Sequence, residues 1–204
     1  MITIATLLWA PNGESFSFSR MYDESWVEKL YRGFARNLSR PFRFVCFTDR
    51  PRSFAESIEQ EPIRGPLGYA ACIEPYRLDA PMILVGLDTV IVGNCDPLAD
   101  YCLSADVLAV PRDPYHPARA CNGVALVPGG QAARMWNGFD GRNDMEWIRA
   151  NPHAFLDDLF PGAVISYKVQ ARGRGIGGAS IVYFHGKLKP HELSGEPFVR
   201  AHWR

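Results

Sequence analysis

The chain has 204 residues, of which 47% are hydrophobic and 22% are charged, as in a soluble globular protein that can bury a sizeable core. This length predicts one domain over residues 1–204. Lysine plus arginine and aspartate plus glutamate number 22 each, so the net charge is zero. That balance excludes the global basic field of a dedicated nucleic-acid binder and leaves only a local basic groove open. No apolar run reaches the ~18 residues of a membrane span, and the first residues lack the features of a signal peptide.

Taken in chain order, the first predicted element is a strand over residues 2–9, which is apolar and β-branched and ends at the turn over residues 10–13. Asp23 suits the start of a helix. Apolar residues then recur at helical spacing as far as Leu38, and Pro41 stops the helix.

The rest of the chain continues this alternation of strands and helices. Further strands are predicted over residues 42–48, 57–63, 82–92, 107–110, 123–127, 164–168 and 180–184, and further helices over residues 67–78, 131–139, 145–150 and 153–159. Strands and helices alternate in the first half and strands dominate later. The predicted fold class is therefore α/β, with a Rossmann-type mixed sheet flanked by helices in a single compact domain.

The cysteines are five in number and contain no C-x-x-C pair. They are Cys46, Cys72, Cys95, Cys102 and Cys121. An odd number without metal-binding spacing predicts buried free thiols in a reducing compartment, and hence a cytoplasmic protein, rather than disulfides or a zinc site.

Residues 82–93 form a nearly continuous apolar run that one carboxylate, Asp88, interrupts. Such a run is typical of a strand buried on both faces. Burying a carboxylate is costly unless a metal ion, a hydroxyl or a positive charge meets it. Asp88 is therefore either a metal or ribose ligand at the end of a central strand or a capping carboxylate that accepts hydrogen bonds from the following turn.

A second polar group follows the last predicted strand, where His185, Gly186 and Lys189 precede Pro190. A histidine can bind a metal, a glycine allows close approach of the backbone, and a lysine can meet a phosphate. The alternative is a solvated basic turn at the end of a strand.

Several of these segments together resemble the family-eight glycosyltransferases of the GT-A type. Gly86-Leu87-Asp88 is similar to their D-x-D motif, and residues 183–190 are similar to their H-x-x-G-x-x-K-P motif. Cys121-Asn122-Gly123 resembles their N-S-G strand entry, and Asp144-Met145 their D-Q pair. Tyr22 with the helix after it, and residues 44–49, look like their nucleotide-side opening, so the resemblance covers most of the chain in order.

This resemblance implies a GT-A-like fold and transfer of a sugar from a nucleoside diphosphate donor, a uridine diphosphate sugar, to an unidentified acceptor with retention of configuration. It implies a divalent cation, Mn²⁺ or Mg²⁺, at Asp88 and His185, with Lys189 and Gly186 at the diphosphate. It implies that Asn122 and Asp144 orient the donor sugar as catalytic residues. The residues that it assigns to the rest of the nucleotide site are Leu8, Trp9, Tyr22, Asp49 and Thr89.

The chain also departs from the family pattern at four polar positions. Gly86 stands in place of an aspartate, Met145 of a glutamine, Tyr183 of the metal-binding histidine and Cys72 of a lysine. A cation held by a single carboxylate is weak, because divalent ions draw on more oxygen ligands. A metal-independent enzyme in which Lys189, or Arg172 with Arg174, neutralises the phosphate therefore stays open. So do a nucleotide-sugar-binding protein without turnover and a glycosyltransferase acting on modified nucleic acid, although zero net charge counts against the last.

Residues 173–178 formally satisfy the pattern G-x-G-x-x-G of dinucleotide-binding folds. That fingerprint requires a preceding strand and a following helix within a βαβ unit of about 30 residues, whereas a strand-like run follows here and only 26 residues remain (204 − 178). The segment is predicted to be a loop over the site, in which Arg172 and Arg174 clamp phosphate, or a plain surface turn.

Overall fold

The computed structural model of the protein describes residues 1–13 and 15–204, except for the side chain of residue 18. Its centre is a seven-stranded sheet in the order β3-β2-β1-β4-β7-β6-β8. The strands are β1 (Ile2–Leu8), β2 (Phe42–Thr48), β3 (Glu59–Pro62), β4 (Met82–Val85), β6 (Ala109–Val110), β7 (Val124–Val127) and β8 (Ala154–Phe155). Strands β3, β2, β1 and β4 are parallel, and β7 is antiparallel to β4 and β6. The ends of β1 and β4 therefore lie at the same edge of the sheet as the entry to β7.

Helices α2 (Glu24–Asn37) and α3 (Asp96–Ser104) contribute to the core on one face of this sheet. Successive side chains of a strand point to opposite faces, so Ile4 and Ile83 pack with Leu30 in this core while their strand neighbours face away. Helix α2 begins where the Asp23 carboxylate accepts a hydrogen bond of 3.0 Å from the Ser25 N–H, which satisfies one of the free amides of the first turn.

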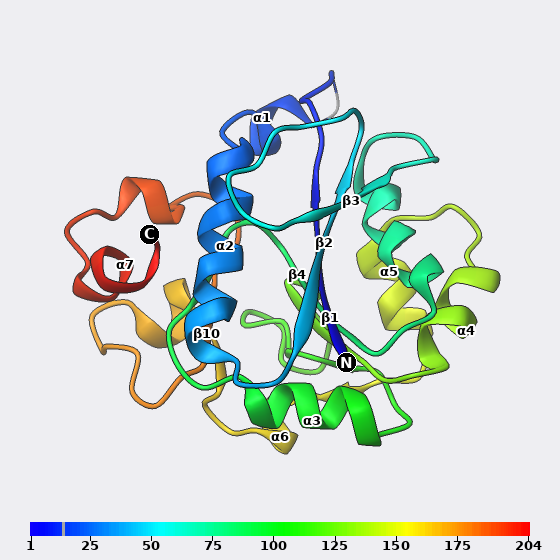
Figure 1. The fold of residues 1–204 in the computed structure, drawn as a ribbon. Coiled ribbons are helices and arrows are strands. Elements are labelled where there is room, and N and C mark those ends of the chain that lie inside the picture. The colour runs from blue at the N-terminus through cyan, green and yellow to red at the C-terminus, as the bar shows by residue number, and fades with distance from the viewer. Residues whose placement is uncertain (14) are drawn as a thin grey trace.

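The opposite face is covered by η1 (Tyr69–Leu78), α4 (Gln131–Asn137) and α5 (Asp144–Ala150). In Figure 1, α2 lies on one side of the strands and α4 and α5 lie on the other. Ile73, Met135 and Ile148 from these helices pack on Ala5 and Leu84. The sheet is thus the middle of three layers, and the predicted α/β class with a mixed sheet flanked by helices is confirmed.

A second sheet has the order β5-β10-β9, formed by β5 (Thr89–Ile91), β10 (Ile181–Tyr183) and β9 (Val164–Ser166). The prediction of one strand over residues 82–92 is therefore wrong. Strand β4 ends at Val85, and the chain leaves the large sheet through Gly86 and enters the small one at Thr89. The Gly86 N–H still donates to the Gly123 carbonyl at 3.1 Å, whereas the Asp88 carbonyl already accepts from the Phe184 N–H at 3.1 Å. Asp88 is thus in the junction between two sheets rather than inside a strand.

Other elements also differ from the prediction. Residues 153–159, predicted as a helix, form strand β8 and then α6 (Leu156–Leu159), because Ala154 and Phe155 pair with β6. Residues 167–168, predicted as strand, begin the π-helix η2 (Tyr167–Ala171), and residues 69–78 form a 3₁₀ rather than an α-helix. The elements without a sequence prediction are α1 (Phe16–Ser19), α3, η3 (Pro190–Glu192) and α7 (Pro197–His202). Within the described residues, every helix is too short or too polar to cross a membrane.

Candidate active site

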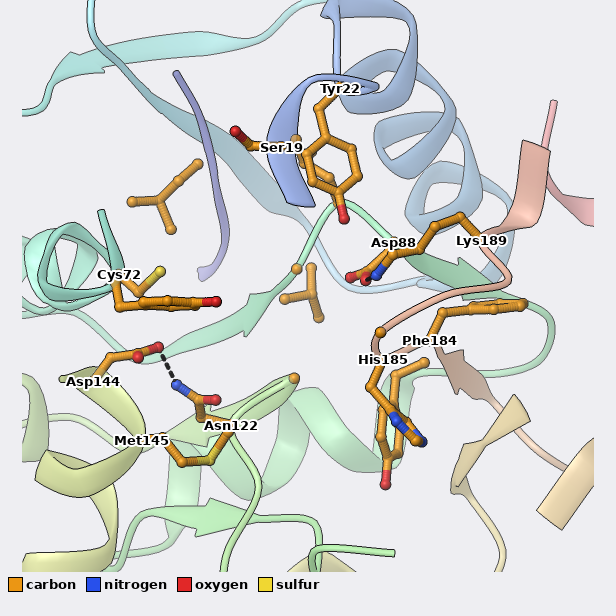
Figure 2. Close-up of a pocket in the computed structure, with 18 of the residues that line it drawn as sticks. Ser19, Tyr22, Cys72, Asp88, Asn122, Asp144, Met145, Phe184, His185 and Lys189 are labelled. Carbon is orange, nitrogen blue, oxygen red and sulfur yellow. Dashed lines mark hydrogen bonds and ion pairs between the residues drawn. The ribbon is translucent and has the colours of Figure 1, made fainter. Parts of the chain in front are cut away.

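A cavity of about 970 Å³ lies at the edge of the large sheet where β1 and β4 end. Because β7 runs antiparallel to β4, with Val124 opposite Val85, the residues before β7 lie beside the residues after β4. Strand β10 pairs with β5 so that Tyr183 lies opposite Thr89, and the segment after β10 therefore lies beside Asp88. Four connections that are distant in sequence thus line one cavity (Figure 2), at the place where ligands bind in open α/β sheets.

One wall of the cavity is built around Asp88. The Lys189 ammonium pairs with the Asp88 carboxylate, and the two side chains are only 9% and 17% exposed. The Tyr22 hydroxyl points toward the same carboxylate (Figure 2). Burial, together with the charge of Asp88 and a hydrogen bond to it, raises the pKa of Tyr22 well above its ordinary value. Asp88 is therefore a buried carboxylate that a cation and a hydroxyl satisfy, two of the partners that its burial in an apolar run requires.

The same wall continues into His185 and Gly186. The His185 Nε2 atom lies 2.9 Å from the Ser166 hydroxyl oxygen. Burial, and then the charges of Lys168 and Lys189, lower the pKa of His185, which favours its neutral form. Gly186 has a left-handed backbone with φ of 61°, and a Cβ atom there would lie 3.2 Å from the Lys168 Nζ atom. Lys168 thus lies directly beside the backbone of this wall.

The predicted metal ligands do not fit a divalent cation in this arrangement. The Asp88 carboxylate already holds Lys189, and His185 contacts Ser166 and has two lysines as neighbours. Across the described residues, no group of three or more histidines, cysteines, aspartates or glutamates is placed to hold a metal ion. Divalent ions require several oxygen or nitrogen ligands, and this arrangement does not offer them.

The opposite wall carries Asn122, just before β7, and Asp144, the first residue of α5. The Asn122 amide donates a hydrogen bond to the Asp144 carboxylate (Figure 2). Asp144 is only 6% exposed. Burial raises its pKa, and this effect prevails over the hydrogen bonds from Asn122, the Met145 N–H and the Cys72 thiol, which lower it. The pair offers an amide and a carboxylate oxygen to the cavity, and these groups can hydrogen-bond the hydroxyls of a sugar.

The other predicted residues divide into two sets. Leu8, Trp9 and Tyr22 line the cavity together with the residues above. Asp49 and Thr89 are not among its described lining residues. The Asp49 carboxylate instead accepts from the Ala10 N–H at 3.2 Å and pairs with Arg52 at 2.8 Å, so it anchors the segment after Trp9. Thr89 is buried, and its hydroxyl has no hydrogen-bond partner among the described residues.

The fold of the chain is similar to that of solved structures of other proteins. Two structures of LgtC, one of an active-site mutant and one of this galactosyltransferase with donor and acceptor sugar analogs, superpose with TM-scores of 0.61 and 0.59. Each is 9% identical, and the superposition covers 98% and 97% of this chain and 93% of LgtC. The glycosyltransferase GlyE from Streptococcus pneumoniae TIGR4 has a TM-score of 0.61 at 10% identity over 94% of this chain and 56% of GlyE. The chain has the fold of the GT-A-like glycosyltransferases.

The sequence comparisons give no match: no protein-family model and no curated protein matches this chain. At 9–10% identity the structural likeness defines the fold, and the activity is a matter for the site itself. The predicted fold class is thereby confirmed in its GT-A-like form as well.

Sequence reasoning did not assign Lys168 to the site, although it noted the segment that contains it. The feature that could have placed Lys168 near the site is the pairing of the two strands that precede it and His185. Strands β9 and β10 are parallel, with Ser166 opposite Tyr183, so the residues that follow each strand emerge at the same edge. Lys168 is not itself among the described residues that line the cavity, but its Nζ atom lies beside Gly186, which is. Arg172 and Arg174, the predicted phosphate clamp, are exposed and are also not among the described lining residues.

Proposed function

We propose that this protein transfers a sugar from a nucleoside diphosphate donor to a hydroxyl group of an acceptor. The supporting observation is that one cavity on a glycosyltransferase fold has a cationic wall with Lys189 and a polar wall with Asn122 and Asp144. A donor of this kind has the same two parts, an anionic diphosphate and a sugar rich in hydroxyls. A volume of about 970 Å³ is at the upper end for ligand sites and leaves room for an acceptor beside the donor.

In this proposal each wall binds one part of the donor. Lys189 and the backbone at Gly186 bind the diphosphate, and Asn122 with Asp144 holds the sugar through its hydroxyls. Leu8, Trp9 and Tyr22 offer apolar and aromatic surface to the nucleoside, for which we propose uridine. LgtC, which shares the fold, is a galactosyltransferase with known donor and acceptor analog complexes, and this supports a sugar donor here.

The proposed reaction breaks the bond between the anomeric carbon and the diphosphate oxygen and forms a bond between that carbon and the acceptor hydroxyl oxygen. The electron pair of the broken bond stays on the diphosphate, and the hydroxyl proton is transferred to the diphosphate, so nucleoside diphosphate is the second product. The Lys189 ammonium stabilises the charge that develops on the leaving group. We propose that the anomeric configuration is retained.

A second candidate is a protein that binds the nucleotide sugar without turnover. It is favoured by Met145 and Tyr183, which both line the cavity and offer a thioether and a phenol where glycosyltransferases of this type carry an amide and an imidazole. The five free cysteines support a reducing compartment, and we propose the cytoplasm for either function.

The test is release of uridine diphosphate from a panel of uridine diphosphate sugars, measured with and without simple sugar acceptors. Turnover that Asp144→Asn lowers at least tenfold, while Asp140→Asn does not, supports the transferase. Asp140 is a matched control because it is an exposed aspartate paired with Arg142 outside the cavity. Calorimetric binding of the donor without any release supports the binding protein, and absence of binding contradicts both.

A further inference from the structure

The glycine at residue 86, which replaces a carboxylate of the metal-binding pattern, is structurally connected to the position of Asp88. The Asp88 carboxylate is turned toward Gly86, and a Cβ atom at residue 86 would lie 2.9 Å from its Oδ1 atom. This is closer than real Cβ contacts allow. A first carboxylate at residue 86 therefore has no room while Asp88 holds its present position. The present orientation of the Asp88 carboxylate therefore depends on the absence of a side chain at residue 86. In this orientation the carboxylate pairs with Lys189.

Lys189 is held in place from both its side chain and its backbone. Its ammonium pairs with Asp88, and its backbone N–H donates to the Glu192 carboxylate at 2.7 Å at the start of η3. An ammonium has three N–H donors, so the contact with Asp88 leaves donors available for a ligand in the cavity, which Lys189 lines. Asp88 thus holds the Lys189 ammonium in place at the cavity.

A second cation, Lys168, lies beside this pair without a carboxylate of its own. Among the described residues no hydrogen bond or ion pair to the Lys168 side chain is present. Burial is the main cause that lowers the pKa of Lys168. The charges of Lys189 and Arg172 lower it further, and Glu192 opposes them. The Nζ atom lies at Gly186, whose left-handed backbone lacks a side chain that would keep a ligand away. An anion at this wall would relieve the repulsion between the two lysines.

The charge balance of the wall differs from that of a metal centre. Two carboxylates and a divalent cation sum to zero, whereas here the two carboxylates of Asp88 and Glu192 are opposed by three ammonium groups, those of Lys187, Lys189 and Lys168, which leaves one positive charge (3 − 2). The wall therefore attracts a diphosphate as it stands, and a divalent cation approaching Asp88 would have to displace the Lys189 ammonium and face Lys168 at short range.

We infer that this protein binds the diphosphate of its ligand without a divalent metal ion, with Lys189, positioned by Asp88, and Lys168 in place of the cation. The inference rests on the proposed function, since it specifies how the same site holds a nucleoside diphosphate.

The test is calorimetric titration of the full chain with uridine diphosphate, once in EDTA and once in excess MnCl₂. We expect the same affinity in both conditions within about twofold, and no manganese binding to the protein alone by electron paramagnetic resonance. Lys168→Met should weaken binding in EDTA by about tenfold or more. Arg200→Met, which removes an exposed cation on α7 away from the cavity, should not change it, and thermal melting establishes that both variants fold.

The outcomes separate the inference from the proposed function. Binding that requires manganese would overturn the inference and leave the transferase proposal intact. Wild-type affinity in Lys168→Met would overturn the role of the second lysine. If neither uridine diphosphate nor a uridine diphosphate sugar binds in either condition, the proposed function fails and the inference fails with it.

Discussion

A Cβ atom on Gly86 would lie 2.9 Å from the Oδ1 atom of Asp88. The two ends of the Gly86-Leu87-Asp88 triplet are therefore sterically coupled, and a side chain at the first end would displace the carboxylate at the second from the position in which it pairs with Lys189. The missing carboxylate at residue 86 is thus part of a different local arrangement, in which an internal ion pair occupies the junction between β4 and β5.

This coupling predicts the effect of a methyl group at residue 86. Gly86→Ala should push the Asp88 carboxylate from its place, loosen Lys189 and weaken binding of uridine diphosphate about tenfold, with a stability cost of about 1–3 kcal/mol from overpacking. Gly195→Ala is the control, because a Cβ atom there meets nothing within 4 Å and the backbone has no positive φ. Calorimetry and urea unfolding measure the two effects. Unchanged affinity in Gly86→Ala would show that Asp88 does not depend on the glycine.

Stability measurements should reveal the Asp88–Lys189 pair as a buried one. Lys189→Met leaves a largely buried carboxylate without its ammonium, which costs about 3–5 kcal/mol of unfolding free energy. The double variant Asp88→Asn with Lys189→Met should recover part of that loss. For comparison, Arg40→Met breaks an ion pair whose side chains are 50% and 47% exposed, and it should cost far less because solvent screens an exposed pair. Equal costs for the two single variants in urea unfolding would contradict a buried pair.

The pH dependence of turnover should reflect Asp144. Burial raises its pKa above the ordinary value of 3.8, and accepting hydrogen bonds from a sugar with both oxygens requires the ionised form. The value of kcat/KM should therefore fall as the pH falls through this raised pKa, at a higher pH than for an ordinary aspartate. A profile that stays flat down to pH values near 4 would argue against an ionised Asp144 in catalysis.

The same pKa makes an independent prediction for stability. A carboxyl whose pKa is higher in the folded than in the unfolded protein contributes stability below the unfolded value, and this contribution is lost as the pH rises through the folded value. The wild type should therefore gain stability relative to Asp144→Asn as the pH falls through the folded pKa toward 3.8. Denaturant unfolding across that interval measures the difference, and a constant difference would contradict the raised pKa.

The cysteines should be unreactive in the folded protein. Burial raises the pKa of Cys46, Cys95 and Cys102 to about 12 each, so at pH 8 the thiolate fraction of each is about 10⁻⁴. Ellman's reagent should react slowly with these three thiols in the native state and with all five cysteines in denaturant. Rapid reaction of three or more thiols in the native protein would contradict their burial.

Local sequence patterns were sufficient for the elements whose burial follows a simple period. The strand β1 and the helix α2 lie close to their predicted positions, because alternation and the 3.6-residue repeat depend on near neighbours alone. The strand predicted over residues 82–92 failed for the opposite reason. Its apolar run is continuous, but β4 and β5 belong to different sheets, and the partners that decide this, β1 and β7 for one and β10 for the other, are far away in sequence.

In the candidate site, too, some features follow from the sequence alone and others depend on contacts between distant residues. The sequence by itself determined which residue types were present, an Asp at residue 88, an Asn at 122, an Asp at 144 and a Lys at 189, and their order along the chain. Only the tertiary structure decided that Asp88 pairs with Lys189 and that the Lys168 ammonium lies beside Gly186. The physical reason is that a charge pair between residues 101 positions apart depends on how two sheets meet, which no local pattern encodes.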